Sequence, residues 1–357
     1  MPGRVAYYER ALPTRCIAPE GFVEFGVALP GRGPMASPDQ VLKIAAKADA
    51  LGYASIFVTD HVVLPASMAR SVYPYSTTGQ LPGGAAQDYL EPIAMLACLA
   101  RVTARARLGT SVLVIPYRHP VLTAKMLATI DQLSGGRVIL GAGVGWLREE
   151  FEALGTPPFE QRGIVTDEYV RLMRTAWTTD PVSFAGRYVS VQGIHVLPKP
   201  AQPGGIPVWI GGHTDAALRR TATLGDGWHP IGMRSSIRLA PEEYATSARR
   251  IHTLAREAGP GPEGDHALSL RVPMEVRPRQ VKAAGRRAAV LPGHGRAGRA
   301  PTSAPTQPSA SRHFVFDSTH QDARRGPRQH GPLRQGRHAG LRVAGGGYGE
   351  RKSARSR

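Results

Sequence analysis

The sequence of 357 residues has only two cysteines, Cys16 and Cys98, and they stand far apart. Two isolated cysteines exclude a disulfide framework and the ligand spacing of a zinc site, and they favour a reducing compartment. No apolar run approaches the roughly 18 residues that cross a bilayer, and the N-terminus lacks the apolar middle region of a signal peptide. We therefore expect a cytoplasmic protein with no membrane partner.

Acidic residues are also scarce, because 27 Asp+Glu stand against 45 Lys+Arg and give a formal net charge of +18. Residues 286–357 contain 15 Lys+Arg and 3 Asp+Glu, a net charge of +12, which leaves +6 for residues 1–285. The basic segment lacks interleaved aromatic residues and any recognisable nucleic-acid-binding module. The charge therefore gives no indication of a specific nucleic-acid partner.

Strand and helix patterns alternate through residues 23–285. The predicted strands are near-continuous apolar runs at 23–30, 54–61, 106–115, 137–145, 207–212, 226–232 and 267–276. Continuous apolar runs are typical of parallel strands that are covered on both faces. Helical patterns separate them, and residues 182–200 have the pattern of an added hairpin. This order predicts an α/β fold, a (β/α)8 TIM barrel with insertions.

The two ends of the chain differ from this body. Residues 1–22 show no clear periodicity, and we expect a poorly structured extension. Residues 286–357 form an Arg/Pro/Gly-rich tail, whose island at 313–317, HFVFD, has the pattern of an eighth barrel strand. Two interpretations of the tail stay open: an authentic disordered segment, or sequence scrambled by reading-frame shifts on both sides of that island.

Polar residues follow several of the predicted strands, at the end where an α/β barrel places its active site. Asp60 and His61 end the second strand, and a histidine at that rim can transfer a proton near neutral pH. Gly211, Gly212 and His213 follow the fifth strand and open a helix, whose backbone N–H groups can bind an anion.

The glycines of GAGVG, residues 141–145, imitate a dinucleotide-binding fingerprint. They follow the fourth strand and not the first, so a Rossmann domain is not indicated. We interpret Gly143 as a small residue that leaves space at the strand end. Glu149 and Glu150 lie nearby, but the pattern assigns them to the following helix. No His, Cys and Glu spacing indicates a metal site.

Several segments carry a family resemblance. They include FVTDHVVLP, RLGTSVLVIPYRHPVLTAKMLATIDQLSGGRVILGAGVGWLREEFEALG, VSFAGRYVS, VWIGGHTDAALRRTATLGDGW and HFVFD. Together they resemble the luciferase-like superfamily of flavin-type oxidoreductases, and within it the branch that depends on the deazaflavin F420. The resemblance implies a (β/α)8 barrel that transfers hydride between F420 and a small organic substrate.

The resemblance also implies roles for individual residues. Asp60 and His61 would face the cofactor ring, with His61 polarising or protonating the reacting atom. A cis peptide bond between Ser111 and Val112 would back the ring. The remaining implied cofactor-binding residues are Gly143 at the strand end, Gly211, Gly212 and His213 at the phosphate, and Gly227 and Trp228 beside it. Similar sugar-phosphate dehydrogenases have a carboxylate at the position of Val144, so that substrate class is not expected here.

Two alternatives stay open. The first is an FMN- and oxygen-dependent monooxygenase of the same superfamily. The second is an inactive cofactor-binding paralogue. The sequence after residue 285 has no helical pattern, so the last helices of the barrel would be missing. The expected partner in either active case is a small-molecule substrate, and a homodimer is left open.

Overall fold

The computed structural model describes residues 23–232, 239–259, 266–273 and 313–317. The expectations for residues 1–22, 286–312 and 318–357 lie outside the described residues. Within the described part, no helix combines the length and apolar character of a membrane span.

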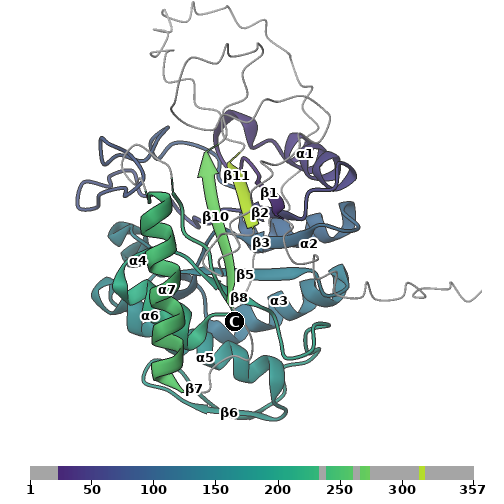
Figure 1. The fold of residues 1–357 in the computed structure, drawn as a ribbon, viewed down its shortest axis with the longest axis vertical. Helices are drawn as coiled ribbons and strands as arrows, with labels where there is room; N and C mark the ends of the chain where they lie inside the picture. Colours follow the sequence, from purple (N-terminus) through teal and green to yellow (C-terminus); the bar gives the residue numbers. More distant parts are fainter. Residues whose placement is uncertain (1–22, 233–238, 260–265, 274–312, 318–357) are drawn as a thin grey trace, which may run out of the picture. The chain divides into compact units, whose positions relative to one another are not determined.

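Eight parallel strands form a closed barrel, in which the third strand is broken into two segments. In order around the barrel they are β1 (Glu24–Ala28), β2 (Ser55–Val58), β3 (Arg107–Thr110) with β4 (Leu113–Val114), β5 (Val138–Gly143), β8 (Val208–Ile210), β9 (Gly227–Trp228), β10 (Ala267–Pro273) and β11 (His313–Asp317). β11 pairs in parallel with both β10 and β1 and closes the barrel; Figure 1 shows it beside β10. The predicted (β/α)8 barrel is confirmed, with HFVFD as its eighth strand.

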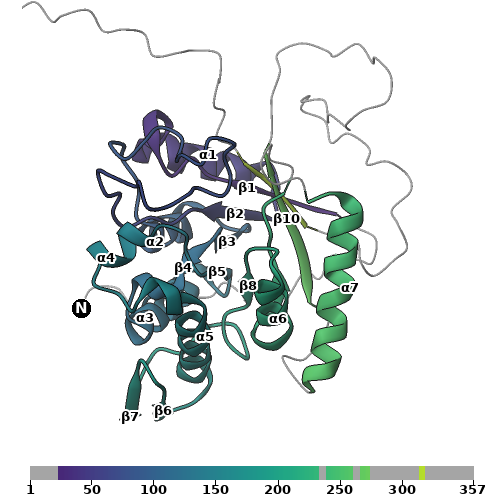
Figure 2. The same ribbon diagram turned by 90° about the vertical axis from the view of Figure 1, so that its left-hand side faces the viewer.

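Helices surround the barrel (Figure 2). They are α1 (Pro38–Ala50), α2 (Pro92–Val102), α3 (Pro120–Ser134), α4 (Arg148–Ala153), α5 (Arg162–Thr178), α6 (Asp215–Leu224) and α7 (Pro241–Ala258), with the short 3-10 helices η1 (Gly33–Met35), η2 (Ile115–Tyr117) and η3 (Phe159–Gln161). The residues at which the helices begin and end are set by local hydrogen bonds and backbone conformation. Ser37 caps α1 by accepting from the Gln40 N–H at 3.4 Å, and Gly135 ends α3 in the left-handed conformation at φ 71°.

The predicted hairpin is also present. β6 (Val182–Ala185) and β7 (Ser190–Ile194) pair antiparallel between α5 and β8. Inside the barrel, the side chains of Phe57, Ile139, Trp209 and Val315 are at most 2% exposed. The interior is a filled core and not a channel, so chemistry is confined to the ends of the strands.

The break in the third strand is a bulge. Leu108 pairs with Val138, but Leu113 pairs with Ala142, so the chain from Leu108 to Leu113 contains one more residue than the stretch of β5 opposite it. The peptide bond between Ser111 and Val112 inside this break is cis. The resemblance implied a cis bond at this position, and the structure confirms it.

Glycines on the neighbouring strands make room for the bulge. A Cβ added at Gly141 would lie 1.8 Å from the Thr110 carbonyl oxygen. A Cβ at Gly143 or Gly211 would lie 2.4 or 2.8 Å from a methyl group of Val112. The space beside these glycines is therefore occupied by the bulge itself, and Gly143 shapes the strand end by admitting Val112.

Gly141→Ala is expected to destabilise the protein, because its methyl group would meet backbone of the adjacent strand and not a movable side chain. We expect the free energy of unfolding to fall by about 1–3 kcal/mol, as measured by urea denaturation. Gly163→Ala is the matched control, because its methyl group would meet only the end of the Arg220 side chain, at 3.3 Å. Equal stability of the two variants would contradict the role of Gly141.

Candidate active site

Asp60 is a structural anchor at the end of β2. Its side chain is fully buried, and Oδ2 accepts from the Val114 N–H at 2.8 Å. The Arg118 guanidinium donates to both carboxylate oxygens at 2.8 Å and also to Glu91 at 2.8 Å. Burial raises the pKa of Asp60, while Arg118 opposes that change. Asp60 thus joins the end of β2 to Val114 in β4 and to Arg118. The sequence pattern did not indicate that Asp60 pairs with Arg118.

His61 is held by a buried glutamate. Its Nδ1 lies 2.6 Å from Glu150 Oε2, and Glu150 is 0% exposed. The same carboxylate accepts from the Tyr117 hydroxyl at 2.9 Å and from the N–H groups of Val62 and Val63 at 2.7 and 3.1 Å. Burial, followed by the charge of Glu150, raises the pKa of Tyr117, which keeps its hydroxyl a donor. The Glu150 carboxylate therefore accepts hydrogen bonds from three neighbouring donors and also contacts the His61 imidazole.

Aromatic rings fix the plane of the His61 imidazole. Tyr89 and Trp146 contact it edge to face, with ring centroids at 5.1 and 5.9 Å and interplanar angles of 77° and 84°. Tyr73 contacts Trp146 in turn, at 5.1 Å. Nε2 of His61 has no hydrogen-bond partner among the described residues, and the residue is 7% exposed. Nε2 is thus the ring nitrogen that can exchange a proton with a ligand.

Glu149, which precedes Glu150 in α4, holds a different part of the same loop. It accepts from the Arg70 N–H at 2.8 Å and from the Ser71 hydroxyl at 2.6 Å. The sequence correctly assigned both glutamates to a helix, α4. It did not indicate that Glu150 reaches His61, because α4 follows β5 and His61 follows β2. Two adjacent glutamates at the start of a short helix were the only available signal.

Beneath the bulge lies a buried polar layer. Ser111 Oγ is 2.8 Å from His229 Nε2, whose Nδ1 is 2.8 Å from Ser269 Oγ. Arg271 donates to the Ser111 carbonyl oxygen at 2.7 Å, across the barrel from β10. Burial, reinforced by the charges of Arg271 and His313, lowers the pKa of His229 to about 3. His229 is therefore a neutral, structural histidine that supports Ser111.

Stability should depend on pH through His229. Between its folded pKa of about 3 and the ordinary histidine pKa of 6.5, the unfolded chain binds one more proton. The free energy of unfolding should therefore fall by about 1.4 kcal/mol for each pH unit of acidification below about 6.5. His229→Asn lacks this titration, so urea unfolding from about pH 7 to about pH 5 should show a flatter profile for the variant. Parallel profiles would show that His229 titrates normally in the folded protein.

The predicted phosphate-binding segment lies between β8 and α6. Gly212 has φ 90°, and Thr214 caps α6 by accepting from the Ala217 N–H at 3.3 Å. Nδ1 of His213 is buried and has no hydrogen-bond partner among the described residues. Glycine, a helix N-terminus and an unsatisfied ring nitrogen together make a polar cradle that suits an anionic group.

Trp228 and Gly227, also predicted for the cofactor site, form β9 next to this cradle, and Trp228 contacts it directly. Trp228 is 0% exposed, and its Nε1 donates to the Gly212 carbonyl oxygen at 2.8 Å. Its ring stacks on Tyr244 with centroids 4.7 Å apart. A Cβ at Gly227 would lie 2.8 Å from the Ala267 carbonyl oxygen. Trp228 therefore holds the Gly212 turn through a hydrogen bond, whereas Gly227 allows β9 to lie close to β10.

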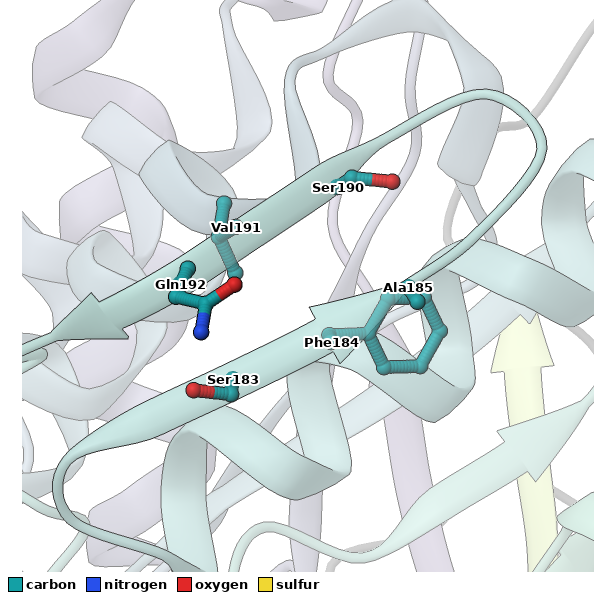
Figure 3. A pocket seen from close by; sticks show the side chains of 6 residues that line it. All are labelled: Ser183, Phe184, Ala185, Ser190, Val191 and Gln192. Atoms are coloured by element: carbon teal, nitrogen blue, oxygen red, sulfur yellow. The ribbon is translucent and has the colours of Figure 1, made fainter.

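A hollow of about 400 Å³ lies elsewhere, on the β6–β7 hairpin. Figure 3 shows the side chains that line it, which are Ser183, Phe184, Ala185, Ser190, Val191 and Gln192. None of the six is ionisable, so this surface offers no acid–base chemistry. Within the described ranges, no three His, Cys, Asp or Glu side chains gather as metal ligands.

The chain is similar to proteins of known and unknown activity. An uncharacterized protein of Mycobacterium tuberculosis is 35% identical over 230 residues, which are 64% of this chain and 76% of that protein. The F420-dependent glucose-6-phosphate dehydrogenase of Amycolatopsis mediterranei is 30% identical over 194 residues, 54% of this chain and 53% of the enzyme.

Two solved structures share the fold. An F420-dependent secondary alcohol dehydrogenase in complex with an F420–acetone adduct has a TM-score of 0.59 and 21% identity, over 72% of this chain and 71% of that one. The oxygenating constituent of 3,6-diketocamphane monooxygenase from Pseudomonas putida, in complex with FMN, has a TM-score of 0.52 and 19% identity, over 71% and 67%. Residues 23–345 match the sequence profile described as luciferase-like monooxygenase. The chain therefore belongs to the luciferase-like monooxygenase family of flavin- and F420-dependent oxidoreductases and monooxygenases.

Proposed function

We propose that this protein is an F420-dependent oxidoreductase that transfers hydride between F420 and a small organic substrate. The observation that carries the proposal is His61, which lies at the end of β2 with Nδ1 on the buried Glu150 carboxylate and with Nε2 unpaired among the described residues. A histidine so placed is suited to general acid–base catalysis. The choice of cofactor is supported by the similarity to an F420-dependent relative and to an F420-dependent solved structure.

The residues at the strand ends fit a flavin-type cofactor. The Gly212 turn, the start of α6 and the unsatisfied Nδ1 of His213 suit its anionic tail. The bulge at Ser111–Val112, held by Arg271, would support its ring. When bound, such a cofactor would accept or donate the hydride.

The chain's own contribution to the chemistry is a proton at His61 Nε2. This nitrogen would take the proton of a substrate hydroxyl or return it to a carbonyl oxygen. Val144 offers no carboxylate near β5, and Asp60 is committed to Arg118. His61 is therefore the ionisable group that we assign to proton transfer.

The alternative is an FMN- and oxygen-dependent monooxygenase, which the FMN-bound structural neighbour favours. The purified full chain should be titrated with F420 and with FMN while cofactor fluorescence is recorded. Saturable binding of F420 without a response to FMN is the expected result. Binding of FMN alone, with oxygen uptake by reduced FMN above the free-flavin rate, would replace this proposal by the monooxygenase. Binding of neither would indicate an inactive paralogue.

A further inference from the structure

We propose that Glu150 is the positioning residue that fixes the tautomer of His61 and so makes Nε2 a proton acceptor. This inference rests on the proposed acid–base role of His61. Nδ1 of His61 and Oε2 of Glu150 are 2.6 Å apart, and both side chains are at least nine-tenths buried, with exposures of 8% and 0%. A carboxylate accepts hydrogen bonds and does not donate them, so the proton of a neutral His61 lies on Nδ1.

The carboxylate is fixed by the backbone that carries the histidine. Oε1 of Glu150 accepts from the N–H groups of Val62 and Val63, at 2.7 and 3.1 Å. Oε2 accepts from the Tyr117 hydroxyl, at 2.9 Å. Residues 61–63 thus wrap around one carboxylate, which prevents it from rotating away from the ring.

The other described groups around His61 do not set its tautomer, because none of them hydrogen-bonds the imidazole. Asp60 is adjacent in sequence, but its oxygens are occupied by Arg118 and Val114. Tyr89 and Trp146 touch the ring edge to face. Among the described side chains, Glu150 is the one that hydrogen-bonds the imidazole.

Glu150→Gln should reverse the tautomer. The amide oxygen must stay on the Val62 and Val63 N–H groups, because an amide NH₂ there would face two donors. The NH₂ group then points at His61 Nδ1 and donates to it, which moves the imidazole proton to Nε2. A wrong tautomer at a catalytic histidine costs about 10⁴-fold in kcat in a well-studied triad enzyme, and we expect a loss of about 10²–10⁴-fold here.

Glu149→Gln is the matched control. Glu149 is the neighbouring residue on the same helix and holds the same loop through Arg70 and Ser71, but it has no bond to His61. If Glu150 only ties down the loop, both variants should behave alike. If it sets the tautomer, only Glu150→Gln should change it.

The test is ¹⁵N NMR of the His61 ring in the full chain without cofactor, assigned by its loss in His61→Gln. We expect a protonated Nδ1 and a bare Nε2 at alkaline pH in the wild type and in Glu149→Gln, and the reverse in Glu150→Gln. A bare Nδ1 in the wild type would overturn the proposal without any variant, as would an unchanged tautomer in folded Glu150→Gln. Because no cofactor is present, failure of F420 binding would leave this result intact and would count only against the proposed function.

Discussion

His61→Ala is expected to lower kcat by about 10²–10⁴-fold while cofactor binding is preserved. The imidazole is the ionisable group at the end of β2 that we assign to proton transfer, and its Nε2 has no partner among the described residues. The side chain lies on Glu150, Tyr89 and Trp146, so its removal leaves the strand bulge and the Gly212 turn in place. Steady-state turnover with the cofactor identified by titration measures kcat, and fluorescence titration of the same variant measures the cofactor Kd.

The control for this variant is His195→Ala. His195 lies after the β6–β7 hairpin with 65% of its side chain exposed, and pairs only with Asp180 among the described residues. Its removal should change neither kcat nor Kd. Recovery of turnover by added imidazole would support proton transfer by His61. Undiminished turnover in His61→Ala would refute the acid–base role, and weakened cofactor binding would reassign His61 to the cofactor site.

Arg118→Ala is expected to lower the free energy of unfolding by about 3–5 kcal/mol, because it leaves the Asp60 carboxylate buried without its counter-ion. The Asp60 side chain is 0% exposed and that of Arg118 is 12% exposed. The pair joins the end of β2 to the segment after β4, so cofactor affinity should fall as well. Urea denaturation monitored by tryptophan fluorescence measures the change in stability.

Two comparisons separate the buried charge from other effects. Arg70→Ala breaks an ion pair whose partners, Arg70 and Glu152, are 57% and 52% exposed, and it should change stability little. In the Arg118→Ala background, Asp60→Asn removes the stranded charge and should restore part of the lost stability. Equal losses in Arg118→Ala and Arg70→Ala would show that the buried pair contributes no more than a surface pair.

The elements of the barrel could be predicted because each carries a local signal. Buried parallel strands are continuous apolar runs, and HFVFD at 313–317 has that pattern even inside an Arg-rich region. Ser37 and Pro38 start a helix through contacts within one turn. The cis bond at Ser111–Val112 has no signal of its own in Thr110-Ser111-Val112, and only the family resemblance implied it.

Partnerships within the site were not predictable from position in the chain. His61 and Glu150 are 89 residues apart, and Ser111 and Arg271 are 160 apart. Closure of the barrel brings the ends of β2, β4 and β5 to one rim, and the packing there decides which carboxylate meets which base. Asp60 therefore takes Arg118, and His61 takes Glu150. The sequence by itself determined the strands, the helices and the rim at which polar residues gather, because apolar periodicity and helix caps act over a few residues. The tertiary structure alone decided the hydrogen-bond partners, because those depend on distances between segments that only the folded chain sets.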